Sequence, residues 1–212
     1  MHNNKVGVYH YKSCNSLSLI SAMKQGSIEH NVSDDIHELL KFKKIIIPGV
    51  GNMSNFFNDY DVNRFKDKIK EYTNNGGIVY GICLGMQVFL ENSEESNSKT
   101  LGLVAGNTIS LKKDYNLSMN VGFKKINFNK NEKIFFNLFK NISVKAKFYF
   151  LHKYHCLINE KLIEKVYSDF ENDRIISAIY KNNILGTQFH PELSGQQGIR
   201  FLKNFSEFDF NK

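Results

Sequence analysis

The chain has 212 residues, of which 42% are hydrophobic and 23% charged, a size and composition typical of one globular domain. No apolar run approaches the roughly 18 residues needed to cross a bilayer, and residues 1–5 lead directly into a strand-like run. We therefore expect a single cytoplasmic domain over residues 1–212, with no membrane contact.

The net charge of +7 does not indicate a nucleic-acid partner, because the lysines are interspersed with Asn, Asp and Glu and form no basic stripe. The three cysteines, Cys14, Cys83 and Cys156, lie far apart and include no CxxC pair. This spacing indicates neither a disulfide framework nor a zinc site, so we expect no metal. Cys14 and Cys156 are interpreted as structural thiols.

In the first half of the chain, short β-rich runs alternate with helical runs. In the helical run 61–73 apolar residues recur at the helical period, Asp61 is a candidate cap, and a Gly-containing turn at 74–77 ends it. Such alternation predicts parallel strands flanked by helices, with active sites at the carboxyl ends of the strands. The expected strands are 5–9, 44–47 and 78–82, and the expected helices are 17–25, 61–73 and one opening at Leu84.

After a polar loop at 91–98, the pattern changes to strands separated by turn residues. The expected strands are 103–111, 123–128, 147–152, 175–181 and 184–189. Asn182-Asn183 predicts a hairpin turn between the last two, and a closing helix is expected over about 195–205. The predicted fold class is α/β: a mixed, mostly parallel sheet flanked by helices, with an antiparallel C-terminal part.

One cysteine lies where an apolar strand turns abruptly into a helical pattern, in Ile78-Val-Tyr-Gly-Ile-Cys-Leu-Gly-Met-Gln87. Such a turn strains the backbone of a nucleophile, lifts its side chain clear of the sheet and crowds its neighbours, which favours the glycines Gly81 and Gly85 on either side. A helix opening at Leu84 would direct free N–H groups and partial positive charge at Cys83. These groups would favour the thiolate and stabilise an oxyanion.

Both prolines of the chain follow apolar strands. Pro48 opens a glycine-rich turn whose backbone N–H groups, at Val50 and Gly51, are candidates for a second oxyanion donor beside Leu84. Pro191 ends a strand at His190, so that this imidazole and the Glu192 carboxylate project from one turn. The predicted catalytic residues are therefore Cys83 as nucleophile, His190 as base and Glu192 as its orienter. Such a triad suits acyl transfer from an amide through a thioester.

Each motif alone has an ordinary structural explanation, as a packing turn around a buried thiol, a simple turn or a loop. Together they follow strands that end at one edge of the sheet, and they supply nucleophile, base and oxyanion donors without duplication. His152 and His155 are alternative bases, but neither has an acidic residue close by in sequence.

Taken together, the motifs resemble the class I (triad) glutamine amidotransferases over nearly the whole chain. Gly81–Gln87 matches the family's nucleophile turn, Ile47–Gly51 its oxyanion loop, and Gln188–Glu192 its base and orienter. A fourth segment, Tyr149-Phe-Leu-His152, is similar to a strand of one branch of the family, the glutaminase subunits of imidazole glycerol phosphate synthase.

The resemblance implies hydrolysis of L-glutamine to glutamate and ammonia, with no cofactor. It implies that Gln87 and the polar stretch near Glu91 hold the amino-acid end of glutamine. The ammonia would pass to a (β/α)8 barrel cyclase/synthase subunit, which forms a heterodimer with the glutaminase and makes a histidine precursor. We also expect low activity alone, and stimulation by the partner through a shift of the loop around Val50.

The chain departs from the family's pattern outside the triad. Near the start it has Lys12 within His10-Tyr-Lys-Ser-Cys-Asn15, where an acid and glycines are usual; Asn120 lies in a segment that usually reads Pro-His-Met-Gly-Trp; and Leu193 replaces a lysine. The first and last lie where the family's glutaminase meets its barrel. The alternatives are a paralogue that serves a different barrel, amidating a surface or flagellar sugar, a stand-alone cysteine hydrolase, and a non-catalytic regulatory subunit.

Overall fold

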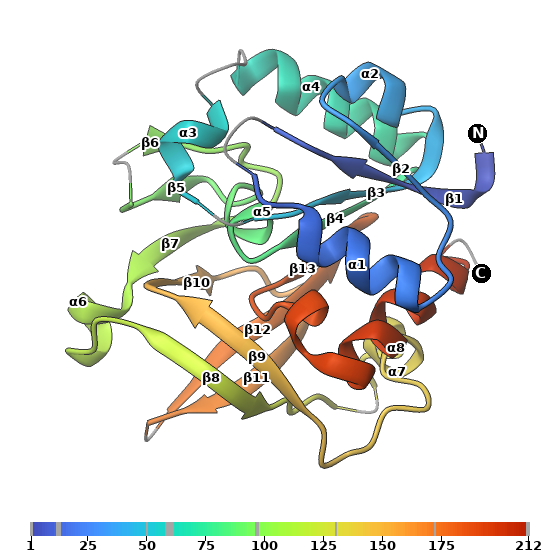
Figure 1. The fold of residues 1–212 in the computed structure, drawn as a ribbon. Coiled ribbons are helices and arrows are strands. Elements are labelled where there is room, and N and C mark those ends of the chain that lie inside the picture. The colour runs from blue at the N-terminus through green and yellow to red at the C-terminus, as the bar shows by residue number, and fades with distance from the viewer. Residues whose placement is uncertain are drawn as a thin grey trace.

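The computed structural model describes residues 2–11, 14–49, 51–57, 62–95, 98–129, 131–171 and 173–210 (Figure 1). Its centre is a seven-stranded sheet with the strand order β11-β12-β13-β4-β3-β1-β2. The five strands from β13 to β2 are parallel, and β11 and β12 continue the sheet in antiparallel pairing. The strands are β1 (His2–Tyr9), β2 (His30–Ser33), β3 (Phe42–Ile47), β4 (Ile78–Ile82), β11 (Glu164–Phe170), β12 (Asp173–Lys181) and β13 (Ile184–Thr187).

The central strands are buried on both faces, as their continuous apolar runs require. Apolar residues of α2 (Ile36–Leu39), α3 (Met53–Phe57) and α4 (Val62–Asn74) pack into one core cluster, on one face of the sheet. Residues of α1 (Leu17–Gln25), α7 (Lys133–Leu138) and α8 (Gly195–Glu207) pack into a second cluster, on the other face (Figure 1). The predicted α/β class, with helices on both faces and an antiparallel C-terminal part, is confirmed.

Two smaller sheets stand apart from the central one, where the sequence predicted a single mixed sheet. A four-stranded sheet has the order β10-β7-β5-β6, and β8 pairs with β9. In β8 and β9 alternate residues face the core and the surface, a pattern that fixes which side of a strand is buried but not which sheet it joins. These strands are β5 (Asn92–Ser93), β6 (Ser98–Lys99), β7 (Gly106–Ser110), β8 (Asn120–Lys125), β9 (Lys147–His152) and β10 (Tyr154–Ile158).

Several predicted elements have the observed bounds: 17–25, 78–82 and 147–152. Asn182 and Asn183 both have positive φ, 47° and 65°, as a tight hairpin turn requires. The expected cap Asp61 lies outside the described residues. The predicted start of a helix at Leu84 is confirmed, but α5 (Leu84–Gln87) has only four residues, too few for the dipole expected to act on Cys83.

The remaining elements are α6 (Leu111–Tyr115) and the 3-10 turn η1 (Pro191–Leu193). Among the described helices, none is long and apolar enough to span a bilayer.

Candidate active site

The three strands that precede the predicted motifs are neighbours in the central sheet. β4 lies between β3 and β13, and all three run parallel, so their carboxyl ends meet at one edge. The turn at Pro48 follows β3, Cys83 follows β4, and the turn at His190 follows β13. The expected gathering of the motifs at one end of the sheet is therefore confirmed.

Cys83 occupies the strained turn that the sequence indicates. Its φ of 52° and ψ of −104° lie in a region that residues with a side chain rarely adopt. A Cβ at Gly81 would overlap the carbonyl of Gly85, and a Cβ at Gly85 would overlap the carbonyl of Ile47. Glycine is therefore required on both sides of the cysteine by close backbone approach.

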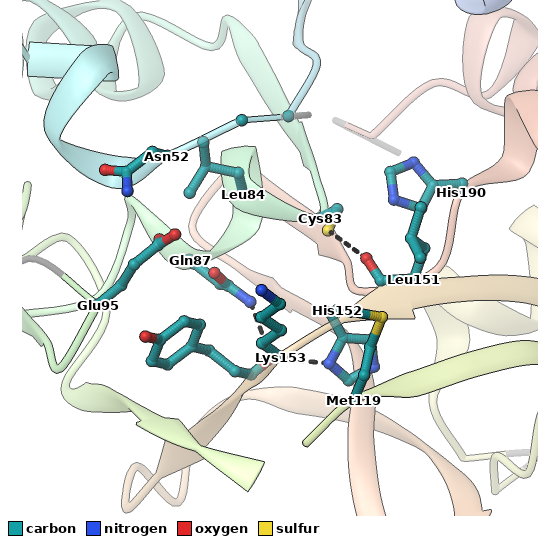
Figure 2. A pocket seen from close by; sticks show the side chains of 13 residues that line it. Asn52, Cys83, Leu84, Gln87, Glu95, Met119, Leu151, His152, Lys153 and His190 are labelled. Carbon is teal, nitrogen blue, oxygen red and sulfur yellow. Dashed lines mark hydrogen bonds between the residues drawn. The ribbon is translucent and has the colours of Figure 1, made fainter. Parts of the chain in front are cut away.

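A cavity of about 350 Å³ lies over this turn (Figure 2). Five of the predicted residues contribute to its walls: Cys83, His190, Gly51, Leu84 and Gln87. Val50, the remaining oxyanion candidate, lies outside the described residues. Glu192 does not line the cavity and contacts His190 instead. The other lining residues are Gly49, Asn52, Glu95, Met119, Leu151, His152, Lys153 and Tyr154.

His190 is held in place by contacts on both its ring and its backbone. Its Nδ1 lies 2.8 Å from Glu192 Oε1, and its backbone N–H donates to Tyr149 O at 2.8 Å. Burial lowers the pKa of His190, but the charges of Cys83 and Glu192 and its hydrogen bonds to both outweigh burial and raise that pKa well above its usual range. The site therefore favours the protonated, imidazolium form of His190.

The backbone N–H of Leu84, a residue that lines the cavity beside the thiol, lies outside the hydrogen-bond pattern of α5. The first backbone bonds of α5 are made by Met86 N and Gln87 N, both to Cys83 O, so Leu84 N–H has no helical partner. The Pro48 turn is pressed against this point, since a Cβ at Gly49 would overlap backbone atoms of the Cys83 turn. Tyr11 anchors the turn from behind by donating to Pro48 O at 3.1 Å.

His152 lines the cavity, but both of its ring nitrogens are already hydrogen-bonded. Nδ1 lies 2.7 Å from Tyr154 O, and Nε2 lies 2.9 Å from Asn120 Nδ2. Burial lowers the pKa of His152 to about 3, so the ring stays neutral. His155 lies away from the cavity, 2.9 Å from Asp114. The geometry favours neither as the base.

We expect His152 to destabilise the fold in acid. The unfolded chain binds a proton at this position near pH 6.5, whereas folded His152 stays neutral down to about pH 3, so stability is lost as pH falls. From pH 7.5 to pH 5 the free energy of unfolding should fall by about 2 kcal/mol more in the wild type than in His152→Gln. Urea unfolding at the two pH values measures this difference, and equal losses in both proteins would contradict it.

Three side chains beside or within the cavity were not individually assigned a role by sequence reasoning. Gln188 is fully buried with Nε2 3.5 Å from Cys83 Sγ, while Lys153 and Glu95 line the cavity. Strand alternation could have indicated Gln188, because it lies two residues before His190 and shares its side of an extended chain. Glu95 lies in the polar stretch that was expected near the substrate, whereas Glu91 accepts from Gly106 N and does not line the cavity.

The three departures from the family's pattern fall in different environments. Asn120 is 1% exposed and bonds His152, so it belongs to the interior. Leu193 is 39% exposed, on η1. Lys12 lies outside the described residues.

Comparisons with known proteins agree with the sequence motifs. The family model described as glutamine amidotransferase class-I matches residues 11–207. The imidazole glycerol phosphate synthase subunit HisH of Chlorobaculum tepidum is 35% identical over 199 residues, covering 93% of this chain and 97% of its own. The subunit of the same name from Pyrococcus furiosus is 38% identical over 175 residues, covering 82% and 86%.

Solved structures share the fold at low identity. The structure of PurLQS from Thermotoga maritima aligns with a TM-score of 0.67 at 16% identity, covering 95% of this chain and 97% of that one. A crystal structure of a glutamine amidotransferase aligns with a TM-score of 0.66 at 14% identity, covering 94% and 97%. At these identities the likeness concerns the fold alone.

Proposed function

Because the chain belongs to the class I glutamine amidotransferases, and within them to the HisH subunits of imidazole glycerol phosphate synthase, we propose that it hydrolyses L-glutamine to glutamate and ammonia for a synthase partner. The observation that carries this proposal is that Cys83 and His190 line one cavity, while Glu192 contacts the ring nitrogen Nδ1 of His190. Release of ammonia from glutamine by the purified chain, with and without a barrel partner, tests it.

The proposed reaction begins with attack of the Cys83 thiolate on the γ-carbonyl carbon of glutamine. Negative charge moves to the carbonyl oxygen, where the N–H of Leu84 and those of the loop at Val50 and Gly51 would receive it. His190 gives its proton to the leaving nitrogen, so that ammonia departs and a thioester remains. His190 then takes a proton from water, which attacks the thioester and releases glutamate and the Cys83 thiolate.

Glu192 supports both steps without contacting the substrate. Its contact with Nδ1 fixes the ring so that Nε2 is the nitrogen that exchanges the proton, and its charge stabilises the imidazolium. The same carboxylate is one cause of the raised pKa of His190.

Glu95 and Lys153 are suited to the amino-acid end of glutamine. In Figure 2 Glu95 lies at the end of the cavity opposite His190, and Lys153 projects between them. Burial raises the pKa of Glu95, while the N–H of Met53 and the charge of Lys153 partly offset that rise. The two side chains would bind the α-ammonium and the α-carboxylate respectively, with the γ-amide placed toward Cys83.

Glu95→Gln and Lys153→Met are each expected to raise KM for glutamine about tenfold with little change in kcat. A charge-assisted hydrogen bond of about 1.5 kcal/mol is lost equally from the ground state and the transition state. Steady-state kinetics of ammonia release measures both constants. Glu94→Gln is the matched control, because that neighbouring carboxylate is paired with Lys113 at the surface. A fall in kcat with unchanged KM would refute the assignment.

An exposed apolar surface beside the cavity fits a protein partner. Met119, Val121, Phe123 and Leu151 are 38% to 54% exposed, and we call them the apolar face. They lie on the outer side of the β8–β9 pair, where Val121 is opposite Leu151, and two of them also line the cavity. We propose that the (β/α)8 barrel cyclase/synthase subunit covers this face in a heterodimer and receives the ammonia there.

The alternative is a paralogous glutaminase that supplies a different barrel, for amidation of a surface or flagellar sugar. Leu193 favours it, because the position next to Glu192, usually a lysine in the family, is here an exposed leucine. Assays of ammonia-dependent product with each candidate barrel separate the two partners. Restored growth without histidine, in a strain lacking the subunit, would exclude the paralogue as sole role.

A further inference from the structure

Gln188 lies beside the nucleophile and has the chemistry to stabilise its charged form. The side chain is fully buried, and its Nε2 is 3.5 Å from Cys83 Sγ, within the range of a nitrogen donor to sulfur. The thiol also contacts Leu151 O at 3.8 Å, but a carbonyl oxygen accepts hydrogen bonds and cannot stabilise a thiolate. Of these two contacts, only Gln188 suits the negative sulfur.

The orientation of the Gln188 amide follows from a chain of hydrogen bonds that starts at a backbone carbonyl. Gln87 Nε2 lies 3.1 Å from Tyr154 O, which is an acceptor only, so the NH₂ of Gln87 must face it. The same NH₂ lies 3.0 Å from Gln188, which must therefore present Oε1. Its own NH₂ is then left to face Cys83.

His152 uses the same carbonyl and reinforces this arrangement. It approaches Tyr154 O at 2.7 Å through Nδ1, which must carry a proton because the oxygen only accepts. Tyr154 O thus receives donors from His152 and Gln87 together. Both N–H groups of Gln87 are occupied by these bonds, so they are not available to glutamine.

We propose that Gln188 is a further catalytic residue, a fixed hydrogen-bond donor to the Cys83 thiolate whose orientation is set by Tyr154 O through Gln87. The proposal rests on Cys83 being the nucleophile of the proposed function. The donor increases the fraction of Cys83 that is thiolate at neutral pH. It also stabilises the sulfur as a leaving group, when the second intermediate collapses to glutamate and the C–S bond breaks.

The test is the pH dependence of Cys83 alkylation by iodoacetamide in the full chain, followed by peptide mass spectrometry from pH 5 to pH 9. Cys14 and Cys156 will not interfere, because burial raises the pKa of Cys14 to about 12 and also raises that of Cys156. Gln188→Met has a similar shape and no donor. We expect the pH of half-maximal rate to rise by about one and the rate at pH 6 to fall about tenfold. The rate at high pH should be retained, because a less stabilised thiolate is at least as nucleophilic.

An unchanged profile in folded Gln188→Met would overturn the proposal, and so would a rate reduced equally at every pH. If Gln188→Met does not fold, Gln87→Met tests the proposal instead. Without the Gln87 amide, the Gln188 amide is free to turn Oε1 toward the sulfur. That variant should shift the profile in the same direction, and an unshifted profile would overturn the proposal. Tyr80→Phe is the control, since it removes a buried hydroxyl that bonds Thr187 and does not contact the thiol. An equal shift there would also overturn the proposal.

Alkylation requires neither glutamine nor a partner. A shifted profile in a protein that hydrolyses no glutamine would therefore reject the glutaminase function and keep the role of Gln188. Normal glutamine hydrolysis with an unshifted profile would reject only the role of Gln188.

Discussion

Cys83→Ala is expected to lower glutamine hydrolysis by roughly 10⁴-fold or more, because the thioester route requires the sulfur and no other thiol lines the cavity among the described residues. Ammonia release with a barrel partner present measures the loss. The variant should remain folded, since alanine removes one sulfur atom from a side chain at the edge of the core.

Cys14→Ala is the matched control, because it removes a sulfur that is also buried but does not line the cavity. It should hydrolyse glutamine at nearly the wild-type rate. If Cys83→Ala retained wild-type activity, the enzymatic interpretation would fail, and a regulatory subunit with an unused triad would be the better description.

A barrel partner with its acceptor bound is expected to stimulate glutamine hydrolysis by about 100- to 1000-fold. This is the effect of one well-aimed oxyanion donor, which we expect the loop around Val50 to supply only in the complex. Val121→Asp should abolish most of this stimulation and leave the rate of the free chain unchanged, because a carboxylate would be buried in the centre of the apolar face. Rates with increasing partner concentration measure both effects.

Val144→Asp provides the comparison for this prediction. Val144 is 93% exposed and lines a separate apolar cavity, formed with residues of α7 and β9. The same charge placed there should leave stimulation intact. If both variants responded equally to the partner, the apolar face would not be the docking surface. Equal turnover with and without the partner would reject partner control altogether.

The chemistry of the site could be predicted from the sequence because its parts are local. The positions of Cys83 and His190 follow from strand ends, and parallel strands bring such ends together whatever the rest of the chain does. The two glycines beside Cys83 are explained by backbone contacts that any residue with a side chain would prevent. These rules act over a few residues and leave little choice of structure.

Contacts made across the fold could not be predicted in this way. Lys153 follows a strand of a small sheet and Glu95 lies in a polar loop, and only the packing of separate sheets places them at one cavity. The sequence identified Asn120 only as a departure from the family pattern, whereas the structure shows it buried and hydrogen-bonded to His152. The pairing of β8 with β9 decides that contact, and periodicity alone does not specify pairing.

The backbone conformation of Cys83 places stability and activity in opposition at one residue. A φ of 52° with ψ of −104° costs on the order of 1–3 kcal/mol for a residue with a side chain, and glycine adopts it without steric penalty. Glycine, which fits this turn with the least strain, has no side chain and therefore cannot perform the reaction. The turn keeps this conformation with a cysteine because the packing of the buried strands and the close backbone contacts at the glycines contribute more stability than the strain costs.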